Sequence, residues 1–440
     1  MSIRPSEPAD AHGDMEDMEE VEDVLLEGDR AFTPGTARSA WSHPRFRTIY
    51  LGAFASNIGT WMQNVVLGAL AYDLTGSGVF VGIVTAAQLG PLLVLSLVGG
   101  ALADAVDRKK ILVTLSVGQG IASLALAAVA LDESPNKLLL VGVVLVIGCM
   151  NALYAPTFSA VVPILVPRRD LAGAISLNSV QMNASRVVGP AIGSLIFANF
   201  GASFVFLINA ISYGAVIIAL TRVPLPEPKS TGTQGLHRLL EGIRYARGHR
   251  EVGQAILVIF IFSLLALPFI TQMPTLADEN LGLAAKSEAY GLLYAAFGLG
   301  AVTGALSIGT LFAGRDKATL TRVGLVVFAG LLAVFSLLRA APPAYPVIFA
   351  VGAAYFAVIT SLSTVLQEHL DDSVRGKVMA LWIMGFGGTV PFGGLAGGWI
   401  AERTSITTMV LVGAAVAVAL AVVFDLRRSP EPASLSPASS

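Results

Sequence analysis

Residues 99–110 read Gly-Gly-Ala-Leu-Ala-Asp-Ala-Val-Asp-Arg-Lys-Lys, with an apolar run on either side. The stretch fits the spacing G-x-L-x-D-x-x-x-R-K, with its five fixed positions filled by Gly100, Leu102, Asp104, Arg108 and Lys109. The stretch therefore predicts a charged hairpin that joins two apolar segments, and the nature of those segments decides the fold.

The composition is that of a membrane protein. Hydrophobic residues make up 54% of the 440 residues and charged residues only 13%, whereas soluble domains carry about 25% charged residues. The mean hydropathy is +0.72. The single cysteine, Cys149, lies in an apolar segment and excludes a disulfide framework within the chain. We therefore interpret the chain as an integral membrane protein.

Twelve segments are apolar enough to cross a membrane, which takes about 20 mostly apolar residues for a core of ~30 Å. They cover approximately 48–72, 78–103, 110–131, 138–162, 171–198, 202–221, 253–275, 288–312, 320–338, 345–367, 376–401 and 406–425. A single long connection, 222–251, divides them six and six. The sequence thus predicts an all-α integral membrane fold of twelve transmembrane helices in two six-helix halves.

The polar segments outside the spans have distinct compositions. Residues 1–45 are rich in acids and lack the basic-then-apolar order of a signal peptide, so they predict a disordered acidic tail. Residues 427–440 are rich in Ser, Pro and Ala and predict a second disordered tail. Between them we expect six-helix bundles at 46–222 and 252–426, joined by the linker 223–251. An apolar stripe with basic flanks in that linker predicts an amphipathic helix on the membrane surface.

Lys and Arg are distributed unevenly between the two sides of the predicted spans. The tails and the loops on their side hold 23 of the 28 cations, the opposite loops hold four, and Arg186 lies within a span. The positive-inside rule therefore places both termini in the cytoplasm. The two halves also share a weak repeat: Gly82, Ala86 and Ala87 recur as Gly291, Ala295 and Ala296 at an offset of 209 residues.

The charged hairpin resembles the signature between the second and third helices of major facilitator superfamily transporters. The resemblance implies a conformational switch formed by Gly100, Asp104, Arg108 and Lys109. The alternative is that the cations only fix the topology. Asp107 stands where the signature usually has glycine, and the corresponding hairpin of the second half, around Arg315, is degenerate.

The fifth predicted span carries the densest polar pattern. Asn178 and Gln181 share one helical face. Arg186 lies 15 residues beyond Leu171, roughly 22 Å at 1.5 Å per residue, and therefore well inside the bilayer. A charge at that depth costs at least ~2.5 kcal/mol and normally faces a cavity or a partner, although an Arg bonded to backbone carbonyls is the alternative. Further along the same span, a group of three residues permits a kink and close helix packing: Gly189, Pro190 and Gly193.

This pattern, N-S-x-x-x-N-x-x-R-x-x-G-P-x-x-G, narrows the resemblance to one branch of the superfamily. It is similar to the branch of transmembrane secretion effectors, which contains the enterobactin exporter and has macrolide efflux relatives. That resemblance implies a secondary active exporter of a small organic molecule (a siderophore, a secondary metabolite or a drug) in the bacterial inner membrane. It also implies alternating access, with protons as the coupling ion.

Amide side chains in the predicted spans are candidates for the transport path, because family geometry places the first, fourth, seventh and tenth spans around it. These amides are Asn57, Gln63, Asn64, Asn151 and Gln272. The polar residues of the fifth span are further candidates for the path: Asn178, Gln181 and Arg186. The alternative is hydrogen bonding between helices, worth about 0.6–2 kcal/mol per contact. The best coupling carboxylate is Asp73, which we hypothesise to pair with Arg186, although Asp73 is expected near the outer interface.

Several other functions find no support in the sequence. There is no P-loop, catalytic triad or metal cluster, so we expect neither an enzyme nor a cofactor. We expect a monomer whose partners are a small-molecule substrate, protons and the lipid bilayer, with no nucleic acid. The alternatives left open are a nutrient importer of the same fold and, less favoured, a non-transporting receptor or scaffold.

Overall fold

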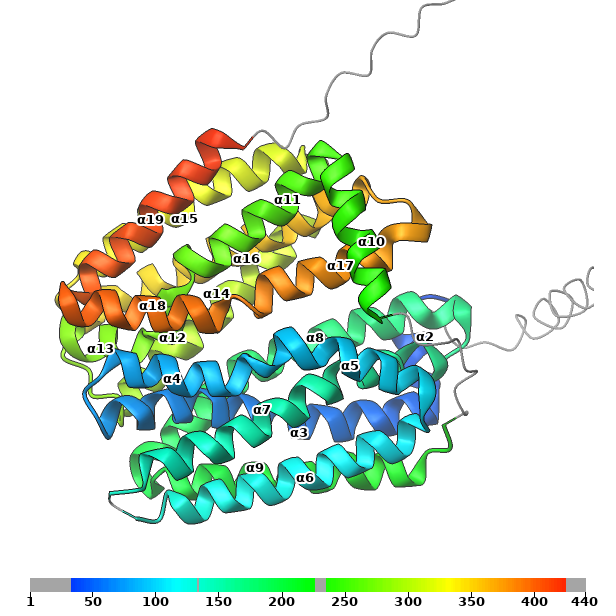
Figure 1. Cartoon of the computed structure of the whole chain (residues 1–440), viewed down its shortest axis with the longest axis horizontal. Coiled ribbons are helices and arrows are strands. Elements are labelled where there is room, and N and C mark those ends of the chain that lie inside the picture. Colours follow the sequence, from blue (N-terminus) through cyan, green and yellow to red (C-terminus); the bar gives the residue numbers. More distant parts are fainter. Residues whose placement is uncertain (1–32, 133, 226–234, 425–440) are drawn as a thin grey trace, which may run out of the picture.

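The computed structural model describes residues 33–132, 134–225 and 235–424, without the side chains of 97, 100–105, 235–239 and 372–373. In these residues all regular structure is helical, as the sequence predicts. The helices form two bundles, which Figure 1 shows one above the other.

The first bundle is built from long helices that follow one another along the chain. They are α3 (Pro44–Asp73), α4 (Gly78–Leu89), α5 (Pro91–Ala105), α6 (Arg108–Val129), α7 (Lys137–Ser159), α8 (Leu171–Phe200) and α9 (Ala202–Arg222). A short helix, α2 (Ala37–Ser42), precedes them, and two 3₁₀ turns, η1 (Val162–Ile164) and η2 (Arg168–Asp170), join α7 to α8.

The second bundle repeats this arrangement with more interruptions. Its elements are α11 (Arg250–Ile261), the π-helical η3 (Phe262–Ala266), α12 (Pro268–Thr271), α13 (Met273–Leu281), α14 (Glu288–Gly309), α15 (Lys317–Leu337), α16 (Ala341–Glu368), α17 (Asp372–Gly387), α18 (Val390–Arg403) and α19 (Ile406–Val423). The helix predicted in the linker is α10 (Gly235–Gly248), which packs against α17, where Glu241 Oε2 lies 2.7 Å from Lys377 Nζ.

Ten helical segments of the described chain are long and apolar enough to span a membrane. The two remaining expected spans, α3 and α8, have 30 residues each, about 45 Å of helix, but are less apolar. Both carry rows of amide and hydroxyl side chains. Polarity rather than length therefore separates α3 and α8 from the other ten.

We call the end of the molecule with α2 and α10 the terminal end and the other the far end; they lie at the right and left of Figure 1. At the terminal end, α2 occupies part of the stretch that we expected to be disordered. The buried Asp170 accepts hydrogen bonds from Gly35 N (3.0 Å) and Ser39 Oγ (2.7 Å), and its other oxygen lies 2.8 Å from His43 Nε2. Burial alone raises the pKa of Asp170, but the bonds from His43, Gly35 and Ser39 outweigh it and hold that pKa below its ordinary value. This network fixes α2 to the start of α8.

Two aspartates cap equivalent helices in the two bundles. Asp107 accepts hydrogen bonds from the backbone N–H groups two and three residues on, at the start of α6 (2.9 and 3.3 Å). Asp316 does the same at the start of α15, and it lies 209 residues later. The hairpin of the second half, which seemed degenerate in sequence, therefore keeps the same helix cap. Asp107 in the signature's glycine position is the residue that forms this cap in the first half.

The bundles meet along two lines, α4 against α18 and α8 against α14. A Cβ on Gly82 would lie 2.9 Å from Gly394 O, and one on Gly291 would lie 2.2 Å from Ser194 Cβ. Gly82 and Gly291 are the repeat partners at an offset of 209 residues. Both lines therefore use the same position of the repeat to bring the helix backbones together.

Candidate functional site

A cavity of about 200 Å³ lies between the two bundles, and both contribute to its wall. The first bundle supplies Trp61 from α3 and Arg186 from α8. The second supplies four aromatic residues from α14 and α16: Tyr294, Phe297, Tyr355 and Phe356. A relative movement of the bundles must change the shape of this cavity.

Three helical spans are interrupted at the cavity. Leu89 and Leu92 line it on either side of the break between α4 and α5, and Gly387 and Val390 do so at the break between α17 and α18. Leu267 lines it where the π-helix η3 ends and α12 begins. Irregular backbone at membrane depth is tolerated where it is buried in protein or lines a cavity, and π-helical turns are frequent at functional sites. The broken helices therefore mark the same place as the cavity.

Arg186 is held between aromatic rings of both bundles. Its guanidinium carbon lies 5.0 Å from the centroid of the Trp61 ring and 4.7 Å from that of Phe356. Its Nε is buried without a hydrogen-bond partner, and no described carboxylate forms a salt bridge with it. Cation–π contacts are worth ~2 kcal/mol or more when desolvated, comparable to the ~2.5–3.5 kcal/mol cost of an Arg at the centre of a membrane helix.

Close packing of α8 on α3 sets the position of Arg186. A Cβ on Gly189 would lie 2.6 Å from Trp61 Cβ, and one on Gly193 would lie 2.9 Å from Met62 Cα. Only glycine lets the two backbones approach this closely. Pro190 has no N–H to donate to the Arg186 carbonyl one turn earlier. Gly189 of the Gly-Pro motif thus packs against Trp61, the residue whose ring Arg186 contacts.

Further buried polar atoms of α8 have no partner in the described structure. Gln181 is 1% exposed and its Nε2 makes no hydrogen bond, and Ser185 is 0% exposed and its Oγ makes none. Spaced four residues apart, Gln181, Ser185 and Gly189 share one face of α8, and Gly189 contacts α3. Two buried polar side chains therefore continue along α8 from the level of Arg186 towards the start of the helix.

Hydrogen bonds close the far end of the cavity. Gln272 is 0% exposed, and its Nε2 donates to Gly78 O in the first bundle (2.9 Å) and to Gly394 O in the second (3.0 Å). Glu402 of α18 accepts hydrogen bonds from Ser77 Oγ and Val79 N of the first bundle. Gln272 therefore fastens the start of α4 to the second bundle from the inside.

Two more bonds join the bundles near the rim of the same end. Tyr72 donates to Asp278 Oδ2 (3.2 Å), and Asn199 donates to Glu288 Oε1 (3.0 Å). Between pairs of described residues, every hydrogen bond that joins the two bundles lies at the far end. We therefore call the far end, where described residues join the bundles by hydrogen bonds, the sealed end of the cavity.

The other polar residues singled out in sequence lie away from the cavity wall. Gln63 is 1% exposed and accepts hydrogen bonds from Ser123 Oγ (3.0 Å) and Asn209 Nδ2 (2.9 Å), all within the first bundle. Asn64 accepts a hydrogen bond from Gln88 of α4. Three amides are partly exposed and do not contribute to the wall: Asn57, Asn151 and Asn178.

Asp73 is the last residue of α3, at the far end, and its side chain is exposed. No salt bridge joins it to Arg186 in the described structure. The reason is position along the helix: Arg186 stacks on Trp61, twelve residues before Asp73, which corresponds to about 18 Å of helical rise.

The signature hairpin lies between α5 and α6 at the terminal end. Lys109 Nζ donates to the carbonyl oxygens of Thr221 (2.9 Å) and Val223 (3.1 Å) at the end of α9, in the same bundle. This contact neutralises the negative end of a helix dipole. Arg108 is the first residue of α6. The side chain of Asp104, and position 100, lie outside the described side chains.

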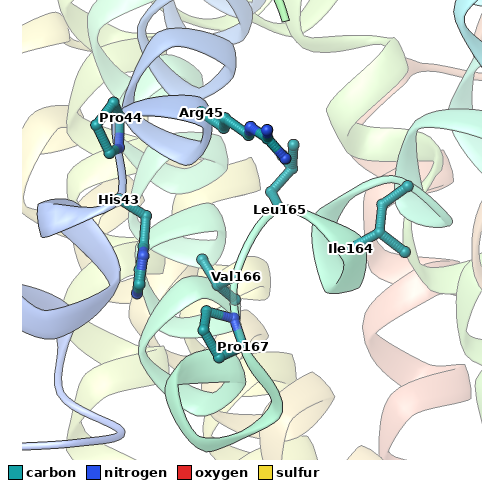
Figure 2. A pocket seen from close by; sticks show the side chains of 7 residues that line it. All are labelled: His43, Pro44, Arg45, Ile164, Leu165, Val166 and Pro167. Carbon is teal, nitrogen blue, oxygen red and sulfur yellow. The ribbon is translucent and has the colours of Figure 1, made fainter. Parts of the chain in front are cut away.

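A second hollow of about 540 Å³ opens at the terminal end (Figure 2). His43, Pro44 and Arg45 line it on one side and residues 164–167 on the other, with Arg45 extending towards Leu165. All these residues belong to the first bundle, so movement between the bundles does not reshape this hollow. The cavity at Arg186 is therefore the better candidate for the site.

Sequence reasoning missed most of the aromatic wall. Tyr294 and Phe297 are three residues apart on α14, and Tyr355 and Phe356 are adjacent on α16. Their rings form a continuous set, with centroids 6.1 Å apart from Tyr294 to Phe297, 5.9 Å from Phe297 to Tyr355 and 4.8 Å from Tyr355 to Phe356. The available signal was four aromatic side chains near the middle of two apolar spans.

Comparisons with known proteins agree with the resemblance seen in sequence. A family model described as transmembrane secretion effector matches residues 36–439. The chain is similar to the enterobactin exporter EntS of Escherichia coli O1:K1 / APEC, with 29% identity over 352 residues that cover 78% of this chain and 81% of that protein. EntS of Shigella boydii serotype 4 gives 29% identity over 351 residues with the same coverage.

Solved transporter structures share the fold. The nucleoside transporter NupG superposes with a TM-score of 0.70 at 16% identity, covering 86% of this chain and 98% of that one. A bacterial homologue of the iron transporter ferroportin, in an inward-facing state, gives a TM-score of 0.68 at 15% identity, covering 86% of this chain and 97% of that one. These comparisons confirm the predicted all-α transporter fold, of whose twelve predicted spans ten meet the length and hydropathy of a membrane span in the described residues.

Proposed function

Because the chain belongs to the family of transmembrane secretion effectors, which are membrane transporters of the major facilitator type, we propose that it exports a small organic molecule across the bacterial inner membrane. The cavity at Arg186 is the transport site in this proposal. The enterobactin exporters similar to the chain support the direction of transport.

The observation that carries the proposal is a cavity built by both bundles, with the hydrogen bonds between described residues of the two bundles at its far end. Transport by alternating access requires such a shared site, closed on one side at a time. The lysine and arginine distribution supports a cytoplasmic terminal end, so the sealed end would face outwards.

Proton antiport is the driving force that we propose. A secondary transporter needs a coupling ion, and Asp73 is the carboxylate that we put forward for it. Its exposed place at the far end supports proton exchange with the outer solution. Proteoliposomes with an imposed pH gradient would test this: Asp73→Asn should abolish gradient-driven accumulation, and unchanged coupling would refute a role for Asp73.

The hairpin of Gly100, Asp104, Arg108 and Lys109 is proposed as the conformational switch. The bonds from Lys109 to the end of α9 support a role within the first bundle in this conformation. Lys109→Gln should slow transport without loss of binding at the cavity. An equal loss of transport and of binding would instead favour a role of Lys109 in folding.

Untargeted mass spectrometry of cells and medium tests the function itself. A deletion strain should retain inside the cell a compound that the complemented strain releases. Complementation with Gly291→Val should fail, because a side chain there collides with Ser194 Cβ at 2.2 Å and keeps the far end from closing. Gly330→Val is the matched control, because a Cβ at that helical glycine has nothing within 4 Å.

The same experiment separates the alternative functions. An importer would leave its compound in the medium of the deletion strain. A receptor or scaffold would give no compound whose distribution follows the protein. Either result would refute export.

A further inference from the structure

The cavity between the bundles carries a positive charge without a compensating negative charge. Among the described residues that line it, Arg186 is the one cationic side chain and none is a carboxylate. The remaining lining side chains are aromatic or aliphatic, apart from the hydroxyls of two tyrosines. A ligand that fills the cavity therefore meets a guanidinium group and apolar surface.

The contacts of Arg186 leave its hydrogen-bonding capacity unused. The guanidinium carbon lies 5.0 Å from the centroid of the Trp61 ring and 4.7 Å from that of the Phe356 ring, so its described contacts are with aromatic rings rather than with hydrogen-bond acceptors. The edge of a guanidinium carries five N–H donors, which match the two oxygens of a carboxylate. In the described structure Arg186 makes no salt bridge, and its Nε makes no hydrogen bond.

We propose that Arg186 binds the anionic group of the cargo, and that the cargo is an organic acid with a flat aromatic or apolar body. This inference rests on the proposed function, since it takes the ligand of the cavity to be the cargo. The carboxylate bonds to the edge of the guanidinium while the rings of Trp61 and Phe356 cover its faces. The body lies against Tyr294, Phe297 and Tyr355, whose rings favour stacked or edge-on aromatic contacts.

Charge and size both restrict the ligand. Aromatic cages also bind quaternary ammonium ions, but here a fixed cation already lies on two of the rings and repels a second one. The cavity volume of about 200 Å³ is below the ~300–1,000 Å³ of sites for drug-sized ligands. In this conformation the cavity therefore fits a small acid, or the acidic end of a larger molecule.

Binding of three matched probes tests the charge preference directly. The probes are 2-naphthoate (anion), 2-naphthamide (neutral) and 2-naphthylmethylammonium (cation), titrated calorimetrically into the full-length protein in nanodiscs at pH 7. We expect naphthoate to bind at least about 30-fold more tightly than naphthamide, the effect of removing one partner of a buried charged pair. Equal affinities for naphthoate and naphthamide, or tighter binding of the cation, would overturn the proposal.

Variants then assign the effect to Arg186. Arg186→Gln should remove the preference for naphthoate over naphthamide, and Arg186→Lys should retain part of it. Arg403→Gln is the matched control, since Arg403 lies 4.7 Å from the Trp399 ring and does not line the cavity. A naphthoate preference that survives in Arg186→Gln would refute the assignment. The comparison of probes on the unaltered protein stands even if this variant does not fold.

Export measurements distinguish this inference from the function on which it rests. If a neutral or cationic compound is exported and Arg186→Gln leaves its rate unchanged, the function stands and the anion site is refuted. If naphthoate binds in an Arg186-dependent manner but no compound follows the protein across the membrane, the anion site stands and export is refuted.

Discussion

Substitution of Gln272 by leucine should loosen the far end of the molecule by an amount that the structure sets. Gln272 Nε2 makes two hydrogen bonds, but only the bond to Gly78 O joins the two bundles; Gly394 lies in the same bundle as Gln272. Both carbonyls lie in helices, so the substitution removes the bond without exposing the helix backbone. One hydrogen bond contributes about 0.5–1.5 kcal/mol net. The ratio of far-end-open to far-end-closed molecules should therefore rise roughly 2- to 13-fold.

Spin labels on the two bundles at the far end would measure this ratio. Leu131 and Ala284 are exposed residues of the first and second bundle, and both can be changed to cysteine after Cys149→Ala. Double electron–electron resonance in nanodiscs should then show the longer-distance population growing in Gln272→Leu.

Gln63→Leu is the matched control for this experiment. Gln63 is also a buried, hydrogen-bonded glutamine, but its partners Ser123 and Asn209 lie in its own bundle, whereas Gln272 bonds to Gly78 of the other bundle besides Gly394 and Thr275 of its own. It should lower stability without changing the distance distribution. A distribution that shifts in Gln63→Leu and not in Gln272→Leu would refute the reasoning.

Three further outcomes follow from contacts already described. Asp170→Asn should lower stability by about 1.5–3 kcal/mol at pH 7, because it removes the charge from a hydrogen-bonded carboxylate. The pKa of Asp170 is lower in the folded state than in the unfolded state, so its contribution to the free energy of unfolding is present above the unfolded-state pKa of ~3.9 and is lost as the pH falls through the folded-state pKa. If melting curves give the same stability difference between the wild type and Asp170→Asn at pH 7 and at pH 3.5, this expectation is wrong. Gly300→Ala should lower the free energy of unfolding by about 1–3 kcal/mol, because the added Cβ would lie 1.9 Å from Phe349 O. Gly330→Ala, where a Cβ meets nothing within 4 Å, should not lower the melting temperature. Glu402→Ala should open the far end in the same spin-label assay, and no shift there would show that its bonds to Ser77 and Val79 do not contribute to closure.

Hydropathy predicted the helices better than their interruptions. The segment 78–103 reads as one continuous span, but the chain forms α4 and α5 on either side of Gly90. The residues around 262–272 likewise contain a π-helix and a short helix within one predicted span. Averaged hydropathy does not register such breaks, because the residues that form them are as apolar as their neighbours. A Gly-Pro pair such as Gly90-Pro91 is the local signal that was available.

The role of a polar side chain in a span depends on packing that the sequence does not contain. Gln63 and Gln272 were both candidates for the transport path. The first joins helices of one bundle, and the second joins the two bundles. Periodicity shows which residues share a face but not which neighbour covers that face. Arg186 was easier to interpret, because the cost of a buried charge restricts its surroundings to a cavity or a partner.

The lines of contact between the bundles have a consequence for the movement that the proposed transport cycle requires. At Gly82, Gly291 and Gly398 the opposing backbone or a small side chain would lie within 3 Å of an added Cβ, so the surfaces that touch there are almost free of protruding side chains. Interlocked side chains would have to withdraw from one another before either bundle could turn. Contacts made mainly by backbone let two helices move past each other without such withdrawal, and the hydrogen bonds described at the far end then resist the movement. A single bulky side chain on one of these contact lines would block that movement while both bundles remained folded.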